Sequence, residues 1–444
     1  MSTARNKPGP AARQAALALG VAAALAAAPA QAWRLDYFLE LALEHNDNVL
    51  LSETDPISDT IATPALGFDL RNDGSAVQAR LAGVVEHRNY LENAYGSELL
   101  AEFDGMLNWV AIPGRLHFVV QDRLTVQPVS LAAPDAPSNR QQINIFAAGP
   151  TVFFRMGPTV NGQAELRYID TWAEDSAGFD SQRMSLALRG AKQIGPGSTL
   201  SANLQAQRVD IEDAGLAPDY DRYDAFLRWR RNLRSFDLEF DAGYSWLDFD
   251  DGGSRSSPLL RAMAAWRASE RTSLAATAMR RFSDTAESLI EPVSLDGTIP
   301  APTLPPGAIS GDAAINALPY RETSFELTWA YEGARATFAA GPFHRRLDYV
   351  ADDGPDQTGR GVQLGFGWRL SSNHRLEIES RIERLRFLET GIENDTRYLA
   401  AFLHRSYTPH WSSRMGYTRY ERDSSETGLS ADQNIWYVAV TYTR

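Results

Sequence analysis

The sequence contains no cysteine among its 444 residues. A disulfide framework is therefore excluded, and so is a lipid attached through a cysteine side chain. Beyond residue 32, no apolar run approaches the roughly 20 residues that a transmembrane helix needs, and the mean hydropathy is −0.32. We therefore expect no membrane-spanning helix in the mature chain.

Recognisable catalytic motifs are also missing. The seven histidines form no H-E-x-x-H pair, and neither a G-x-S-x-G sequence nor a Walker A sequence occurs. The segment DFDDGG at 248–253 resembles a calcium-binding loop, but Gly252 stands where a ligand is required, so we interpret it as an acidic surface loop. We expect no cofactor, no metal and no enzymatic activity, with a hydrolase assembled from distant residues as a remote alternative.

The N-terminus has the organisation of a secretory signal peptide. Three basic residues precede the run AALALGVAAALAAA, and Ala30-Gln31-Ala32 forms a small-residue cleavage site before Trp33. We predict a signal peptide at 1–32 and a mature domain at 33–444. Its removal lowers the net charge from −13 to −16, which argues against nucleic acid as a partner because nucleic-acid binding requires a basic surface.

The mature sequence alternates in polarity throughout, as SFDLEFDAGYSWLDF at 235–249 illustrates. Alternate side chains of a strand point to opposite faces, so Phe236, Leu238, Phe240, Tyr244 and Trp246 share one face, while the other carries Asp237, Glu239 and Asp241. In a soluble sandwich the aromatics would point inward. In a membrane barrel they would face lipid, and the carboxylates would line the lumen.

The connections between strand-like segments favour the barrel. Tight connections occur at 71–75, 112–115, 156–159, 193–198, 230–235, 268–273, 332–335, 370–375 and 406–411. They alternate with longer polar ones near 48–58, 91–96, 127–141, 173–181, 212–219, 249–257, 285–318, 351–359, 389–396 and 423–432. Short turns on one side and long loops on the other are typical of outer-membrane barrels. We count twenty segments, from 35–47 to 433–443, and predict an all-β, antiparallel up-and-down transmembrane barrel of 18–20 strands.

The region 46–115 resembles a known group. It contains Asn48, then Ser58-Asp59 and Pro64-Ala65-Leu66, followed by VVEHRNYLENAYGSELLAEFDGMLNWVAIPGRL. This pattern is similar to the β-barrel porin type 2 group, which includes the exopolysaccharide-locus outer-membrane proteins of PEP-CTERM systems. The resemblance implies a barrel in the outer membrane of a Gram-negative bacterium, linked to polysaccharide secretion, and supplies no catalytic residues.

Charged residues on the expected inner faces form three groups. Arg222, Arg228 and Arg230 precede the row Asp237, Glu239 and Asp241 across a tight turn. A second group places Glu98, Glu102 and Asp104 beside Arg115, His117 and Arg123, and a third is the row Glu377, Glu379, Arg381 and Glu383. Such rows either brace the wall, at about 0.2–1 kcal/mol per cross-strand pair, or filter what the lumen admits.

The longest connection, 285–318, is rich in proline and poor in charge. It either folds into the lumen as a constriction or lies on the surface, and we favour the surface. The leading functional hypothesis is a porin-like conduit associated with exopolysaccharide export. The alternative is a structural or adhesive barrel. Expected partners are outer-membrane lipid, the barrel-assembly machinery (suggested by Trp436, Val438, Val440 and Tyr442 sharing one phase of the last segment), and a polysaccharide with its export apparatus.

Overall fold

The computed structural model describes residues 33–129, 137–213, 218–289, 318–350 and 354–444. The predicted signal peptide and most of the connection 285–318 lie outside these residues. Twenty strands make up almost all of the described chain: β1 (Trp33–Asn46), β2 (Asp59–Asp73), β3 (Val77–Tyr90), β4 (Glu98–Ile112), β5 (Leu116–Pro128), β6 (Arg140–Met156), β7 (Val160–Ala173), β8 (Ser181–Gly195), β9 (Ser198–Ile211), β10 (Tyr220–Asn232), β11 (Phe236–Phe249), β12 (Ser254–Arg267), β13 (Thr272–Ser283), β14 (Tyr320–Glu332), β15 (Ala336–Tyr349), β16 (Gln357–Arg369), β17 (His374–Phe387), β18 (Glu393–Ser406), β19 (Trp411–Ser424) and β20 (Ala431–Thr443). Three short helical turns complete it: η2 (Pro137–Asn139), η3 (Ala177–Phe179) and α2 (Thr285–Leu289). None of the described helices is long and apolar enough to cross a bilayer.

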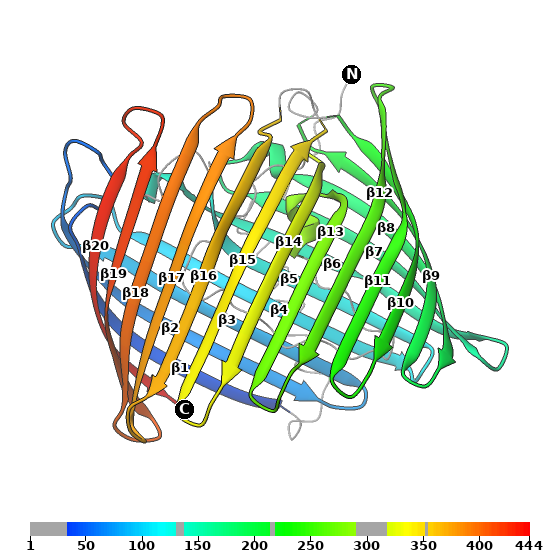
Figure 1. Cartoon of the computed structure of the whole chain (residues 1–444), viewed down its shortest axis with the longest axis horizontal. Helices are drawn as coiled ribbons and strands as arrows, with labels where there is room; N and C mark the ends of the chain where they lie inside the picture. Colours follow the sequence, from blue (N-terminus) through cyan, green and yellow to red (C-terminus); the bar gives the residue numbers. More distant parts are fainter. Residues whose placement is uncertain (1–32, 130–136, 214–217, 290–317, 351–353) are drawn as a thin grey trace.

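Each strand pairs antiparallel with its sequence neighbours, and β1 closes the sheet against β20. The closing pair runs from Phe38 opposite Thr443 to Asn46 opposite Ile435. Arg444 and Tyr37 extend it through two backbone hydrogen bonds of 2.9 Å. The strands are strongly inclined, with β14–β20 forming the near wall and β1–β6 the far wall (Figure 1). The predicted barrel is confirmed, with twenty strands.

The alternation of side chains confirms the inside-out assignment. Phe240, Leu364, Val438 and Val440 are exposed, whereas Asp241 and Ala439, on the opposite face of the same strands, are buried. The outward face is apolar because it meets hydrocarbon, and the inward face is covered by the polar side chains of neighbouring strands. The aromatic positions Tyr244, Trp246, Trp329 and Trp436 also lie on the outward face.

All nine tight connections occur where the sequence predicts them. Several predicted long connections are shorter than expected. The segment 389–396 reduces to the five residues 388–392, because residues 393–396 belong to β18. The segment 249–257 reduces to the four residues 250–253, because residues 254–257 continue β12 as strand. Ser257 pairs with Ser245 across β11. The strands β11 and β12 therefore rise as a long hairpin rather than ending at a broad loop.

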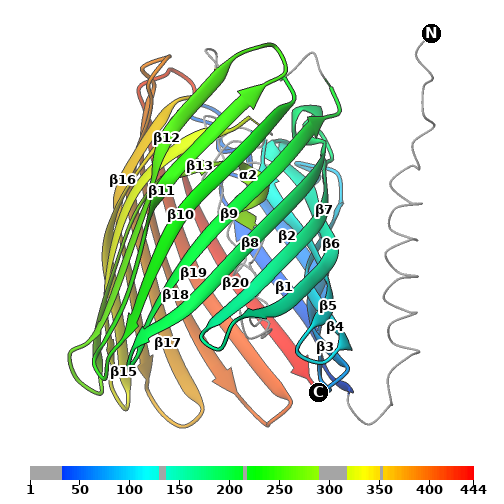
Figure 2. The ribbon, with the colours of Figure 1, turned by 90° about the vertical axis from the view of Figure 1, so that its right-hand side faces the viewer.

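The start of the connection after β13 turns into the barrel. β12 pairs with β13 only from Leu260 to Arg267, so the end of β13 is released from that neighbour. Phe282 packs against the inward-facing Val209, Tyr220 and Leu247. The helical turn α2 follows and lies within the barrel (Figure 2). The surface location favoured for this connection is therefore wrong for residues 285–289, while residues 290–317 lie outside the described part.

Candidate functional site: the lumen wall and an inward clamp

The first predicted charge group forms a ladder across β10 and β11. Arg228 donates two hydrogen bonds of 2.8 Å to the carboxylate of Asp241. Arg230 binds Glu239 at 2.5 Å, and Arg228 also lies 3.4 Å from Glu239. The register explains the pairing, because Arg228 stands directly opposite Asp241 and Arg230 opposite Glu239.

Two members of this group have other partners. Asp237 forms its ion pair with Arg267 of β12, at the turn end of the hairpin. Arg222 stands opposite Leu247, several positions from the carboxylate row. It binds Asp224 of its own strand at 2.9 Å and Glu287 of α2. The predicted pairing of Arg222 with the β11 row is therefore wrong, because the antiparallel register carries it to the far end of the strand.

The second group is brought together only in part. Arg123 stands opposite Asp104 and lies 3.8 Å from it. Glu98 instead accepts a hydrogen bond from the Tyr90 hydroxyl at 3.0 Å, and Glu102 lies two positions from Asp104 on the same inward face. His117 stands opposite Val110 and packs edge-on against Phe153, with ring centroids 4.9 Å apart. Arg115 lies in the turn before β5. A tight turn at 112–115 places Arg115 and His117 beside the end of β4, whereas Glu98 lies at its start.

The third group remains on the inner face of β17. Arg381 binds Glu383 of its own strand at 2.9 Å. Glu377 binds Arg375 at 2.9 Å and His404 of β18 at 2.7 Å. Glu379 faces Ala400 across the β17–β18 pair. Most of these carboxylates already face a cation, which reduces the net field that the row places in the lumen.

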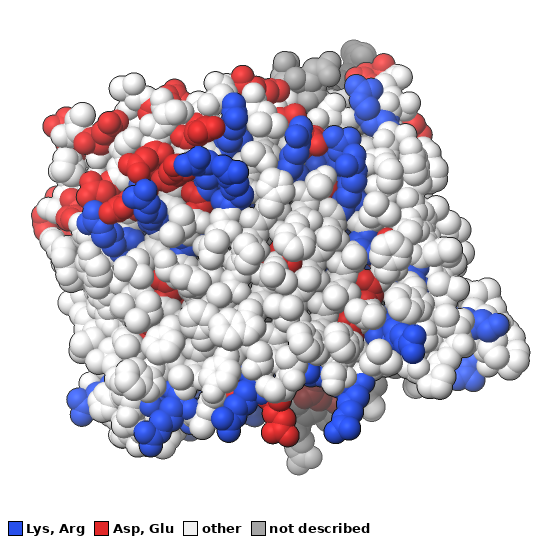
Figure 3. Space-filling model, viewed as in Figure 1, with Lys and Arg blue, Asp and Glu red and all other residues white. Residues whose placement is uncertain are grey.

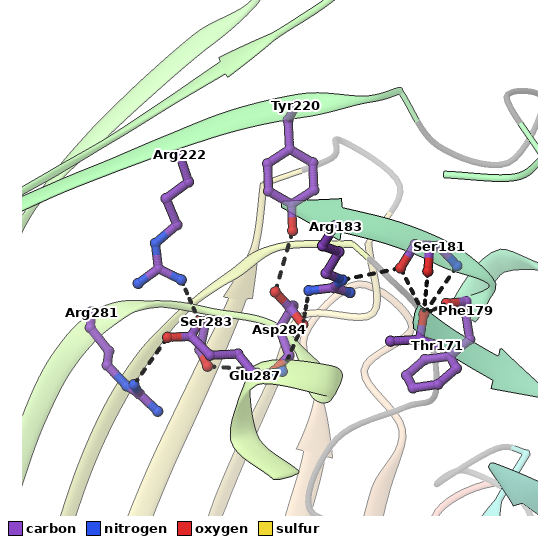
Figure 4. Close-up of polar contacts among 10 residues, drawn as sticks. All are labelled: Thr171, Phe179, Ser181, Arg183, Tyr220, Arg222, Arg281, Ser283, Asp284 and Glu287. Carbon is purple, nitrogen blue, oxygen red and sulfur yellow. Dashed lines mark hydrogen bonds and ion pairs between the residues drawn. The ribbon is translucent and has the colours of Figure 1, made fainter. Parts of the chain in front are cut away.

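Several deeply buried charges belong to a group whose contacts the sequence does not predict. We call Arg183, Arg222, Asp284 and Glu287 the inward clamp. Arg183 Nη1 donates to Asp284 Oδ1 at 2.8 Å, and the two side chains are only 1% and 2% exposed. Arg222 binds Glu287, and Arg281 lies 3.5 Å from the same carboxylate. These residues converge from β8, β10 and β13 on the start of α2 (Figure 4).

Neighbouring contacts hold the clamp in place. The hydroxyl of Tyr220 donates to Asp284 Oδ2 at 3.3 Å, and Arg183 Nε donates to Ser181 Oγ at 3.1 Å. Ala286 of α2 is completely buried in a cluster that includes Ile145 and Phe179. The turn thus contacts the inner wall several strands away from β13. Because the clamp combines buried ion pairs with apolar packing, it fixes residues 284–287 inside the barrel.

A local signal for this turn is present in the sequence. The segment SDTAES places Asp284 three positions before Glu287, the spacing of a helix N-cap and its capping partner. The Glu287 amide donates to Asp284 Oδ1 at 3.0 Å. The signal predicts a helical start at residue 285. It cannot indicate Arg183, which lies 101 positions away and is brought near only by barrel closure.

The electrostatics of Asp284 follow from its surroundings. Burial alone would raise the pKa of its carboxyl group, but Arg183, the backbone amide of Glu287 and Arg222 together outweigh burial and hold the pKa below the ordinary value. The carboxylate therefore remains ionised at neutral pH, which the ion pair requires.

A second part of the lumen is open. A cavity of about 770 Å³ is bounded by residues of β1–β3 and β14–β20, together with the connection after β1, Pro137 of η2 and Arg140 of β6. Its wall combines charged and amide groups with the rings of Tyr90, Tyr398, Phe402, Tyr420 and Tyr437. The guanidinium of Arg414 lies 5.0 Å from the ring centre of Phe402 and 4.6 Å from that of Tyr437. Within the described residues, no group of three histidine, aspartate or glutamate side chains could hold a metal ion.

Comparisons with known proteins identify the fold. No protein-family model matches the sequence, and no curated protein sequence does. Among solved structures, the ferric enterobactin receptor of Pseudomonas aeruginosa is similar at a TM-score of 0.50 and 11% identity, covering 93% of this chain and 80% of that one. A siderophore receptor of Acinetobacter baumannii matches at a TM-score of 0.50 and 9% identity, with the same coverage. At this identity the likeness concerns the fold alone: this chain has the fold of the outer-membrane β-barrels.

Proposed function

We propose that the protein is a passive outer-membrane channel for a polar solute, narrowed towards its long-connection end by the clamped segment 284–287. The observation that carries the proposal is the lumen wall. Its inward side chains are charged, amide-bearing or hydroxylated on almost every strand, and part of the space they surround is open. Barrels of 16–18 strands already leave an aqueous passage, and this one has twenty.

We further propose that the solute is a polysaccharide leaving the cell. The resemblance of region 46–115 to exopolysaccharide-locus barrels supports this assignment. The cavity lining supports it independently, because aromatic faces such as Tyr398 and Tyr437 suit the C–H faces of sugar rings. Amide and charged side chains such as Gln363, Gln433 and Glu379 suit sugar hydroxyl groups.

Single-channel recording tests the channel itself. The purified protein, inserted into a planar bilayer, should give stepwise ionic currents, and neutral oligosaccharides of increasing length should reduce them at decreasing concentrations. Absence of any current would favour the structural or adhesive barrel. Currents that no oligosaccharide affects would retain the channel and remove the polysaccharide assignment. A strain lacking the gene should also accumulate polymer behind the outer membrane.

A further inference from the structure

The outer face of the barrel carries a belt of charge above its apolar band. Arginine and acidic side chains gather over the long-connection ends of β14–β20, while the surface below them is mostly uncharged (Figure 3). Most of the belt is internally neutralised. Arg346 binds Asp348 at 2.6 Å, Arg384 binds Asp395 at 2.6 Å and Arg419 binds Glu421 at 2.5 Å.

One place in the belt is only partly neutralised. Arg360 of β16 stands directly opposite Arg384 of β17 on the outer face. Like charges directly opposite each other across strands are destabilising. Asp395, the carboxylate beside them, already accepts both hydrogen bonds from Arg384. Within the part of the chain that the structure describes, Arg360 forms no direct ion pair, so the two arginines share the single carboxylate of Asp395.

The same place is hollow. A groove of about 580 Å³ is lined by three arginines, Arg360, Arg384 and Arg397, and by Asp395 and Glu383. Glu383 is already paired with Arg381 of its own strand. Arg397 holds its acidic neighbours only loosely, at 3.5 Å from Glu421 and 4.0 Å from Asp423. The floor towards the apolar band consists of Val362 and Ile382, which are 42% and 55% exposed.

We propose that this groove binds the phosphorylated headgroup of an outer-leaflet lipid. Guanidinium groups bind phosphate through paired, charge-assisted hydrogen bonds, and basic pockets on membrane proteins recognise lipid headgroups in this way. Arg360 and Arg384 share the carboxylate of Asp395, and the ion pairs of Arg397 are long, so a phosphate would supply a further anion for these cations. The aliphatic side chains directly below would accept the first methylenes of an acyl chain. A lipid fits both halves of the groove, whereas a free phosphate uses only the upper half.

The test uses the intact barrel purified in detergent and examined by native mass spectrometry. The probes are bisphosphorylated lipid A, the same lipid without phosphates, and inorganic phosphate as a competitor. The variant is R360Q/R397Q, which removes two groove cations and leaves the Arg384–Asp395 pair intact. The matched control is R231Q, because Arg231 is an exposed arginine of the outer face at the opposite, tight-turn end of the barrel.

We expect the wild type and R231Q to retain bisphosphorylated lipid A, and R360Q/R397Q to bind it at least tenfold more weakly. Equal retention by all three proteins would overturn the proposal, as would equal binding of the dephosphorylated lipid. Displacement by low millimolar inorganic phosphate would assign the groove to free phosphate and likewise overturn it. Each variant is first checked for the faster gel migration of an unheated folded barrel, and the single variant R360Q replaces the double variant if that one does not fold.

Discussion

Arg183 and Asp284 are 101 positions apart in the chain, yet they form a 2.8 Å ion pair that is almost fully buried inside the barrel. The pair joins the wall strand β8 to the segment that leaves β13. It is the contact that fixes the direction of this segment, since α2 follows it immediately and continues into the lumen.

Removing one partner of this pair should loosen the clamp. We predict that D284N has a higher or noisier single-channel conductance than the wild type. It should also lose roughly 3–5 kcal/mol of stability, because Arg183 is left as an uncompensated buried charge. The control is D237N, whose ion pair with Arg267 is about half exposed at the opposite end of the lumen. Unchanged conductance together with lower stability in D284N would show that the pair only braces the wall.

The clamp should be insensitive to moderate acid. Although burial opposes it, Arg183, the backbone amide of Glu287 and Arg222 together keep the pKa of Asp284 below its ordinary value. The stability contributed by the carboxylate is therefore fully present above about pH 4, the usual aspartate pKa, and is lost as pH falls through the lowered folded value. We expect constant conductance from pH 7 to 5, and an increase in conductance, as the clamped segment is released, only in stronger acid. A transition centred near pH 6 would mean that another group controls the segment.

Adjacent residues of one strand should lose different amounts of stability on the same change. L364R places a cation in the lipid-facing band and should cost roughly 2–4 kcal/mol. G365R points into the lumen, where the nearest atom to an added Cβ is 3.9 Å away, at Ala339, and it should cost much less. Urea unfolding in lipid vesicles measures the stability lost in each of the two variants. Ala439 is a poorer control because it is 1% exposed and has little room. Equal penalties at positions 364 and 365 would refute the assignment of the two faces.

The carboxylates of β11 should contribute unequally to the stability of the barrel. Asp241 is buried and accepts two hydrogen bonds from Arg228, so D241N should lower stability by about 1–3 kcal/mol. Asp237 is about half exposed, and D237N should cost less than about 1 kcal/mol. Thermal unfolding of the two single variants tests the order, and a larger loss for D237N would contradict it.

Ion selectivity should be weakly cationic. Changing Asp237, Glu239 and Asp241 together to Asn, Gln and Asn should shift the reversal potential only slightly towards anions. The shift should be smaller in high salt, since screening lengths fall from about 10 Å at 0.1 M to about 3 Å at 1 M. The shift in reversal potential should be small because arginines of β10 and β12 already neutralise part of the carboxylate row. An unchanged reversal potential with clearly lower stability would make these residues wall braces without a filtering role.

The sequence by itself determined the barrel, its strand number to within one hairpin, and the facing of its side chains. Those features depend on local alternation and on turn residues, as in the row Phe236, Leu238 and Phe240 and the turn at 232–236. Register was predictable where a tight turn fixed it, so Arg228 could be placed beside Asp241. The prediction of cross-strand partners failed where a residue lay far from the turn, as Arg222 and Glu98 show. Each strand position moves a side chain by about 3.3 Å along the wall.

Only the tertiary structure decided which residues enter the lumen and which surface arginines line a groove on the outer face. The inward clamp depends on closure of the sheet, which brings β8 and β10 near the end of β13. The groove at Arg360 depends on strand pairing across β16–β18, and its individual residues look like ordinary surface charges in the sequence. Pairwise contacts between distant strands have no local signature, because they arise from the circumference of the barrel rather than from the order of residues along a strand.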